Sequence, residues 1–209
     1  MPSPSDSARV HKTKEKYSVG LVSRDNDLKN YNYFLSTLGE THTLEEIIDT
    51  YAAKQKLVRV LDLGCGNAQA LHELKEKMGK KVRTIGMDLL PLETKKLDEF
   101  VEGDAIVKEL PKDCDVIISF RALHDMGHIA EVLSKVAYAL RTKGKAYLWI
   151  RLKEDNDPAK FTGEMSFKDQ VFLNDLCGKS LFQTCKVHAK KVPDTNPPQG
   201  YAIVLERLS

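Results

Sequence analysis

The sequence predicts an α/β fold in which a mostly parallel sheet is covered by helices on both faces. Apolar, β-branched runs such as VRVLDL and DVIISF alternate with segments of helical period. Continuous runs of this kind are typical of strands buried on both faces. The last two apolar runs flank only the turn-rich PDTNPPQG, and so tight a return pairs strands antiparallel. We therefore expect parallel strands followed by one antiparallel hairpin.

Length and composition indicate one soluble domain. The chain has 209 residues, 42% of them hydrophobic, and a formal net charge of +2, which gives no protein-wide basic field for nucleic acid. No apolar run is long enough for a membrane span, and the start MPSPSDSARVHKTKEK lacks the apolar core of a signal peptide. The four cysteines contain no CxxC pair, which favours reduced thiols and a cytoplasmic location.

The N-terminal quarter is predicted to differ from the rest. Residues 1–16 are rich in Ser, Pro and Lys, which predicts a disordered tail. Its basic residues suit an acidic protein partner: Arg9, His11, Lys12, Lys14 and Lys16. Residues 17–56 are expected to form an N-terminal helical segment. Within it, Thr43-Leu44-Glu45-Glu46 is a capping-box pattern followed by apolar residues at helical spacing, so we expect a helix over about 43–56.

A domain over residues 57–209 is predicted to alternate strands with helices. The expected strands are 57–63, 82–88, a short one ending at Asp104, 114–120, 145–152, 184–192 and 200–207. The expected helices are 67–79, a short one near 92–99, one from Ile129 to a stop at Gly144, and one from Ser166 to Gly178.

The turn after the first of these strands carries the strongest functional signal. Asp62-Leu63-Gly64-Cys65-Gly66 places two glycines where a strand becomes a helix, which lets the backbone approach a ligand beyond the sheet. The third glycine of the dinucleotide fingerprint is missing, because position 69 is Gln. An adenosine ligand with an amino-acid tail fits this loop. Asp88, at the end of the next strand, can accept both ribose hydroxyls, and Asp104 can meet the adenine amino group.

In order and spacing, VLDLGCG, GMDLLP, EGDA, DVIISF and ALRTKGKAYL resemble the motifs of class I S-adenosylmethionine-dependent methyltransferases over roughly residues 57–207. The resemblance implies a Rossmann-like seven-stranded sheet, six strands parallel and the last antiparallel. It also implies S-adenosylmethionine as cofactor, with the glycine loop at the methionine moiety, Asp62 at its amino group, Asp88 at the ribose, and Asp104 with Ala105 at the adenine. The residues so assigned to the cofactor are Asp62, Gly64, Cys65, Gly66, Asp88, Leu89, Asp104, Ala105 and Phe120.

A narrower resemblance is partial. Asp88-Leu89-Leu90-Pro91, the short link to Glu102-Gly103-Asp104 and the ending KKVPDTNPPQGYAIV are similar to FtsJ-type ribose 2′-O-methyltransferases of RNA. That family uses a Lys-Asp-Lys-Glu tetrad, and the tetrad is not kept, because Phe120 stands at the position of its Asp and Gln199 near that of its Glu. We therefore expect the outline of that family without its ribose chemistry.

The acceptor side of the site should follow the strand at 114–120. His124 is the candidate general base, because a histidine pKa can lie near the working pH, although a helix-start histidine packed against the loop explains it equally well. Arg121 is the candidate clamp for an anionic substrate or the cofactor carboxylate, or else faces solvent. Asp125 is expected to cap the helix that begins at Ile129. HDMGH lacks a third metal ligand, so no metal site is expected.

Together these patterns predict an S-adenosylmethionine-dependent methyltransferase. The acceptor is left open among a small molecule, a protein and RNA, without a strong nucleic-acid signal and without a membrane association. One alternative is a catalytically inactive S-adenosylmethionine-binding subunit that supports a partner. Others are an RNA methyltransferase of FtsJ-like type and a nucleotide-dependent oxidoreductase, which Gln69 disfavours.

Overall fold

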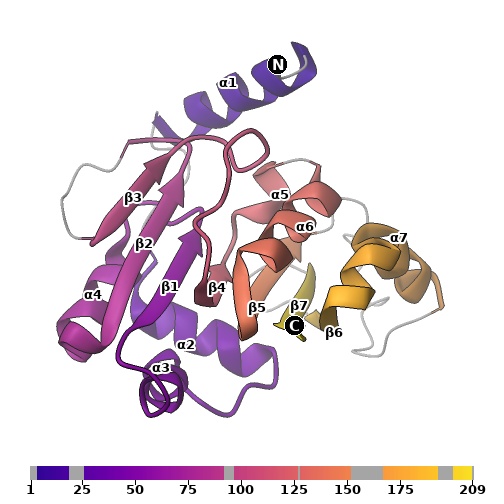
Figure 1. Ribbon diagram of the computed structural model, residues 1–209. Coiled ribbons are helices and arrows are strands. Elements are labelled where there is room, and N and C mark those ends of the chain that lie inside the picture. Colours follow the sequence, from indigo (N-terminus) through magenta and orange to yellow (C-terminus); the bar gives the residue numbers. More distant parts are fainter. Residues whose placement is uncertain are drawn as a thin grey trace.

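A seven-stranded sheet forms the centre of the protein, with strand order β3-β2-β1-β4-β5-β7-β6 (Figure 1). The computed structural model describes residues 4–18, 26–91, 97–126, 128–151, 167–192 and 200–208. The strands are β1 (Val58–Leu63), β2 (Val82–Asp88), β3 (Glu99–Glu102), β4 (Cys114–Ser119), β5 (Leu140–Arg151), β6 (Cys185–Val192) and β7 (Gly200–Arg207). Only β7 runs antiparallel to its neighbours β5 and β6, which confirms the predicted fold class.

Helices cover both faces of this sheet (Figure 1). One face packs against α2 (Leu28–Thr37), α3 (Leu44–Ala52) and α4 (Gln69–Met78), after which a short 3-10 helix, η1, spans Gly79–Lys81. The other face packs against α6 (Ile129–Ala139) and α7 (Phe167–Thr184), with the short α5 (Leu123–Met126) beside them. Within the residues that the structure describes, no helix is long and apolar enough to cross a membrane.

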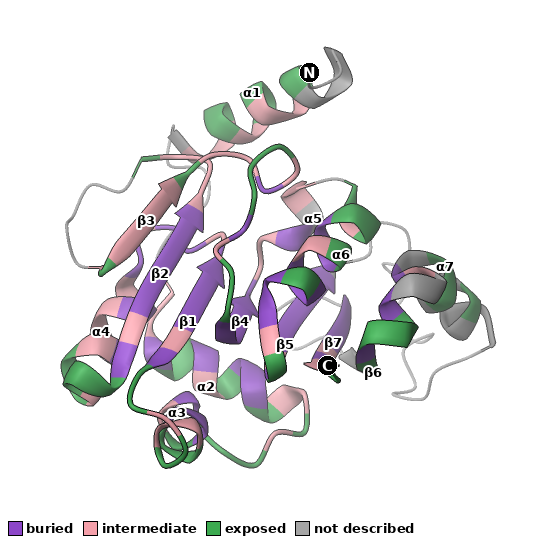
Figure 2. Ribbon diagram, viewed as in Figure 1, coloured by how far each residue is buried: buried purple, intermediate pink, exposed green. Residues whose placement is uncertain are grey.

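The central strands β1 and β4 are largely apolar because they supply both cores. In β1, Val58 and Val60 belong to the core beneath α2, α3 and α4, whereas Leu61 and Leu63 belong to the core beneath α6 and α7. Successive side chains of a strand point to opposite faces, so only a continuous apolar run can fill two cores. Figure 2 shows the result as buried strands β1, β2 and β4 between helices that are buried on one side only, while the edge strand β3 is partly exposed.

An aromatic cluster connects α2 to the end of β4. Phe120, the residue after β4, stacks on Phe34 of α2 with ring centroids 4.8 Å apart. Tyr31 and Trp149 meet the same ring edge-on at 5.8 and 6.5 Å. These offset and edge-to-face geometries are the favourable ones for aromatic pairs. Phe120 therefore positions α2 against the sheet at the edge where the strands end.

Several element boundaries differ from the sequence-based expectation for a physical reason. The capping box is confirmed, with Thr43 and Glu46 bonded reciprocally, but the helix ends at Ala52 and not near residue 56. The strand expected from residue 145 begins at Leu140, with a register shift opposite Cys114. A side chain on Gly144 would lie 2.8 Å from the Cys114 carbonyl oxygen, so this glycine allows two strands to approach and does not stop a helix.

The predicted disordered tail is the main correction to the expected domain organisation. Residues Pro4–Ser18 form helix α1, which lies across the ends of the strands that point toward it in Figure 1. Composition missed this helix because its contacts with the domain are polar and come from residues far along the chain. The expected short helix near 92–99 lies largely outside the described residues, and Glu99 at its end belongs to β3.

We expect α1 to be dispensable for folding and α2 to be essential. Removing residues 1–18 should leave a single cooperative unfolding transition, because the side chains that the structure describes in α1 are at most half-buried. Phe34→Ala, which removes a completely buried ring, should cost about 3–5 kcal/mol of unfolding free energy. Urea unfolding followed by circular dichroism measures both changes.

The matched control is Phe182→Ala, because Phe182 is 44% exposed and its loss should change stability by no more than about 0.5 kcal/mol. Loss of cooperative unfolding in the truncated protein would show instead that α1 belongs to the folding unit.

Candidate functional site

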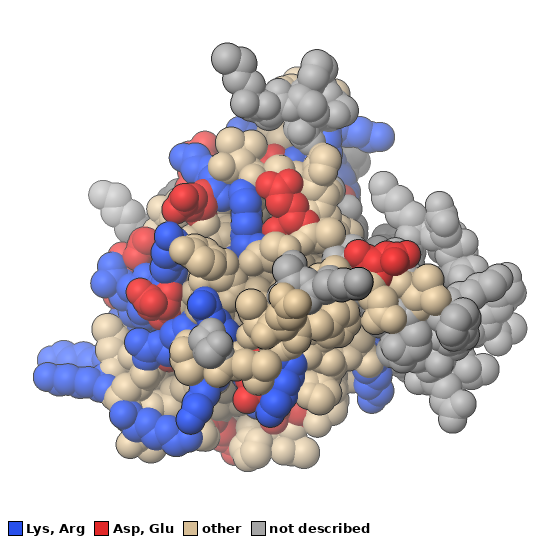
Figure 3. Space-filling view, turned by 45° about the vertical axis from the view of Figure 1, so that its right-hand side comes forward, with Lys and Arg blue, Asp and Glu red and all other residues tan. Residues whose placement is uncertain are grey.

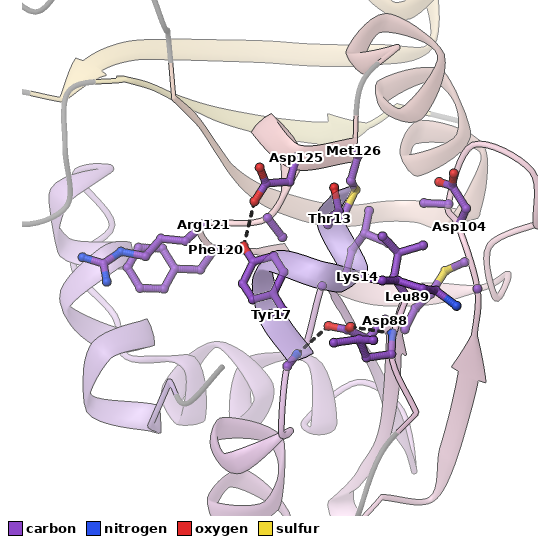
Figure 4. A pocket seen from close by; sticks show the side chains of 18 of the residues that line it. Thr13, Lys14, Tyr17, Asp88, Leu89, Asp104, Phe120, Arg121, Asp125 and Met126 are labelled. Carbon is purple, nitrogen blue, oxygen red and sulfur yellow. Dashed lines mark hydrogen bonds between the residues drawn. The ribbon is translucent and has the colours of Figure 1, made fainter. Parts of the chain in front are cut away.

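The carboxyl ends of the strands border a cavity of about 220 Å³. In parallel sheets of this kind ligands bind beyond these ends. The walls come from the loops after β1, β2, β3 and β4, from α5, and from α1 (Figure 4). The lining residues that the argument uses are Thr13, Lys14, Tyr17, Gly64, Gly66, Asp88, Leu89, Asp104, Ala105, Phe120, Arg121, Asp125 and Met126.

The glycine loop is bonded to the end of β2. The backbone N–H groups of Gly64 and Cys65 both donate to the Met87 carbonyl, at 2.7 and 3.2 Å. Gly64 has φ +83°, and a Cβ on it would lie 2.1 Å from the Cβ of Ala122. Conformation and space both require glycine here. The loop thus passes between β2 and the segment that leads to α5, with its backbone at the cavity.

Asp88 is fixed by the same loop. Its Oδ2 accepts a hydrogen bond from the Gly66 N–H at 2.8 Å, and its Oδ1 accepts one from the Leu90 N–H at 3.0 Å (Figure 4). These two bonds orient the Asp88 carboxylate. The carboxylate lines the cavity at the position expected from the sequence.

Asp62 lies completely buried behind the cavity wall. Its Oδ2 accepts a 2.6 Å hydrogen bond from the Tyr31 hydroxyl, while its Oδ1 has no hydrogen-bond partner among the described residues. Burial, with a smaller contribution from Asp88 and against the Tyr31 hydrogen bond, raises the pKa of Asp62 to about 7. An unused carboxylate oxygen two residues before Gly64 of the cavity wall fits a cationic group held at that loop, such as the ammonium of an amino-acid tail.

The Asp104 carboxylate is bonded to a residue of α1. Its Oδ1 accepts a hydrogen bond from the Ile106 N–H at 3.0 Å, and its Oδ2 forms an ion pair with Arg9. The sequence placed Asp104 at the cavity, where it lies. Its partner Arg9 belongs to a segment that was expected to be disordered.

Arg121 and His124, the two residues expected on the acceptor side, are placed differently by the structure. Arg121 adopts φ +61°, and its guanidinium lies over the Phe120 ring, 5.2 Å from the centroid, pointing away from the cavity in Figure 4. Partial burial lowers the pKa of Arg121. His124 belongs to α5, and its side chain is outside what the structure describes.

The N-cap expected at Asp125 is wrong. Asp125 lies inside α5, and the residue before α6 is His128, in the left-handed region at φ 40°. The Asp125 carboxylate instead lines the cavity and accepts a hydrogen bond from the Tyr17 hydroxyl at 2.7 Å (Figure 4). Its hydrogen-bond donor, Tyr17, lies 108 positions earlier in the chain. A local helix-capping pattern cannot reveal so distant a partner.

Most residues assigned to the cofactor from the sequence meet at this one cavity. The exceptions lie behind it: Asp62 faces Tyr31, and Cys65 is buried against β2, where a Cβ on Gly86 would lie 2.8 Å from its Sγ. Sequence analysis missed Thr13, Lys14, Tyr17 and Met126. The signal available for the α1 residues was helical spacing, since half-buried positions 9, 10, 13, 16 and 17 lie on one helix face.

Comparison with known families adds the decisive observation. Residues 54–184 match the family model of a methyltransferase domain. The chain belongs to this methyltransferase family. The match covers β1 through α7 and therefore includes the glycine loop, Asp88 and Asp104. A search of curated proteins finds no match.

Solved structures share the fold of this methyltransferase domain at low sequence identity. A TehB-like SAM-dependent methyltransferase from Corynebacterium glutamicum ATCC 13032 Kitasato has a TM-score of 0.50 and 16% identity, covering 98% of this chain and 100% of its own. The magnesium protoporphyrin IX methyltransferase of Synechocystis PCC 6803, with bound SAM, has a TM-score of 0.56 and 12% identity over 95% and 97%. The [4+2]-cyclase SpnF has a TM-score of 0.50 and 13% identity over 79% and 81%. Identities this low show the fold alone.

We expect Asp62→Asn to change the pH dependence of stability. The folded chain binds the Asp62 proton more tightly than the unfolded chain, so this group weakens wild-type folding as the pH rises from 3.8, the ordinary aspartate pKa, to about 7. Because Asn does not ionise, the stability of Asp62→Asn relative to the wild type should increase over that interval and stay constant above it. Urea unfolding at a series of pH values measures this difference.

Asp98→Asn serves as the control of opposite sign. Although partial burial acts in the other direction, the hydrogen bond from Lys75 lowers the pKa of Asp98, so its ionised form stabilises the fold at neutral pH and this contribution is lost in acid. If the difference in unfolding free energy between Asp62→Asn and the wild type does not vary with pH, the raised pKa of Asp62 is contradicted.

Proposed function

We propose that this chain is an S-adenosylmethionine-dependent methyltransferase acting on a small molecule. The observation that carries the proposal is that one cavity of a methyltransferase domain is bordered together by the glycine loop, Asp88 and Asp104. The nicotinamide alternative has less support, because Gln69, the first residue of α4, stands where a pyrophosphate-binding loop has its third glycine.

Each part of the cavity has a proposed role toward this cofactor. Asp88 accepts hydrogen bonds from the ribose hydroxyls, and the unused Oδ1 of Asp62, behind the cavity wall, accepts from the amino group through a bridging water. The backbone of the loop at Gly64 and Gly66 contacts the methionine moiety. Asp104 with Ala105 lies at the adenine. Leu89 and Phe120 supply apolar walls beside these polar groups, as in most ligand cavities.

In methyl transfer the protein mainly positions the cofactor and the acceptor relative to each other. When bound by Asp88, Asp104 and the glycine loop, the cofactor would supply a methyl group on a sulfonium, a good leaving group. The chain's residues orient the reactants and exclude water. An acceptor that must lose a proton needs a base, and we propose His124 of α5 for this step. Arg121 points away from the cavity (Figure 4), so we propose that it supports the Phe120 ring.

The cover of the cavity by α1 favours a small acceptor. Thr13, Lys14 and Tyr17 of α1 form part of the cavity wall. A helix across the cavity narrows the access of a folded RNA or protein to the bound cofactor. Both basic and acidic side chains lie on the face of the molecule that Figure 3 shows, in keeping with the net charge of +2.

The FtsJ-like outline gains no support from the site. Phe120, at the position of that family's Asp, stacks on Phe34 within the aromatic cluster. A ring in this place neither holds nor orients a lysine base. The alternative of an inactive cofactor-binding subunit is likewise not favoured by the family match.

We expect S-adenosylmethionine affinity to depend on Asp88. Asp88→Ala should weaken binding by about ten- to a hundredfold, since an unpaired buried diol costs on the order of 1–3 kcal/mol. Asp88→Asn, which keeps the size of the side chain, separates loss of charge from loss of shape. Glu102→Ala is the control, because Glu102 is an exposed acid near the same edge of the sheet. Titration calorimetry measures the affinities, and wild-type affinity in Asp88→Ala would contradict the ribose assignment.

We expect the methyl acceptor to be found among small molecules. Protein with methyl-labelled cofactor should transfer label into a cell extract equally well before and after ribonuclease or protease treatment, with the label in the low-molecular-weight fraction. Mass spectrometry of that fraction identifies the acceptor, and nucleoside analysis checks for 2′-O-methyl products. Transfer that either digestion abolishes would assign a macromolecular acceptor instead.

A further inference from the structure

Helix α1 is attached to the domain along one polar face. Its half-buried residues are Arg9, Val10, Thr13, Lys16 and Tyr17, while Lys12 and its neighbours on the opposite face are exposed. Figure 2 accordingly shows intermediate and exposed residues along α1 but none that is buried. Apolar burial therefore contributes little to the docking of α1.

Three side chains of this face bond to two residues of the cavity wall. Arg9 forms an ion pair with Asp104 and also donates through Nη1 to the Asp125 backbone carbonyl at 3.0 Å. Lys16 Nζ and the Tyr17 hydroxyl both reach Asp125 Oδ2, at 3.0 and 2.7 Å. Asp104 follows β3 and Asp125 lies in α5 after β4, so Arg9 joins two sides of the cavity.

The docked helix forms part of the cavity itself. Thr13, Lys14 and Tyr17 line the same space as Gly64, Asp88 and Met126, and Figure 4 shows α1 passing across that space. A ligand held against Asp88 therefore has α1 over it. Displacement of the docked helix would therefore widen the opening of the cavity.

The bonds that hold α1 are of a kind that breaks readily. The Arg9 and Lys16 side chains are 20% and 37% exposed, and partly exposed ion pairs contribute little stability and weaken in salt. Units attached by few buried apolar contacts open at low free-energy cost. Docking of α1 is therefore reversible on physical grounds.

We propose that α1 is a lid on the cofactor cavity, held closed by Asp104 and Asp125, and that its opening sets the rate of cofactor and product exchange. The proposal rests on the proposed function, because it takes S-adenosylmethionine and S-adenosylhomocysteine as the molecules that exchange. It adds a role for the N-terminal basic residues that neither the fold nor the chemistry of methyl transfer requires.

The test is a ligand-release experiment on the full chain. Protein loaded with radiolabelled S-adenosylmethionine is chased with excess unlabelled S-adenosylhomocysteine, and the bound label is followed by rapid filtration at low and high salt. In Arg9→Ala/Lys16→Ala we expect release to be roughly tenfold faster, because two ion pairs that hold the lid are lost. High salt should speed release from the wild type and have little further effect on the double variant.

Lys12→Ala is the matched control, because it removes one positive charge from the exposed face of the same helix. It should release label at the wild-type rate. Arg9→Lys should be intermediate, since it keeps the charge and loses the second bond to the Asp125 backbone. Amide hydrogen exchange over residues 4–18 gives a second readout, and these amides should exchange faster in the double variant than in Lys12→Ala.

The possible failures can be told apart. Equal release rates in the wild type and the double variant, or equal acceleration by Lys12→Ala, would overturn the lid and leave the proposed function intact. A wild-type protein that binds no S-adenosylmethionine in calorimetry would contradict the proposed function, and the lid would fall with it.

Discussion

Three backbone N–H groups connect the glycine loop after β1 to the end of β2, and the site depends on this connection. Gly64 and Cys65 donate to the Met87 carbonyl, and Gly66 donates to the Asp88 carboxylate. The loop is thereby pressed between β2 and Ala122, so closely that a side chain on Gly64 would collide with that residue. The end of β2, Asp88 and the segment leading to α5 are positioned together because this one loop contacts each of them.

The same end of the sheet collects four carboxylates, and each is stabilised by a different kind of donor. Asp62 is bonded by a tyrosine hydroxyl, Asp88 by backbone amides, Asp104 by Arg9 and one amide, and Asp125 by Lys16 and Tyr17 of α1. Grouped acids repel one another, so their concentration needs compensation. Here part of the compensation comes from Arg9, Lys16 and Tyr17 of α1, and the Oδ1 of Asp62 is left as an acceptor for a cationic group of the ligand.

Phe120 shows how one position separates fold from chemistry. Its ring joins Phe34, Tyr31 and Trp149 and so connects α2 with the sheet, while its edge lines the cavity. A carboxylate at this position would be buried among those rings at high cost. The fold does not dictate which residue follows β4. In this chain the residue at that position, Phe120, serves packing.

The sequence alone determined the strands, the capping box at Thr43, and the meeting of Gly64, Asp88 and Asp104, because these depend on periodicity, local turns and the rule that ligands bind where parallel strands end. Only the tertiary structure decided what Asp62, Asp125 and α1 do. Asp62 acquires its raised pKa from burial against Tyr31, and Asp125 acquires its partners from residues more than 100 positions earlier. The helix face of α1 is polar and its contacts are long-range, so composition suggested disorder. Interactions between distant polar residues have no period in the sequence, and they exist only once the sheet has brought their partners to one edge.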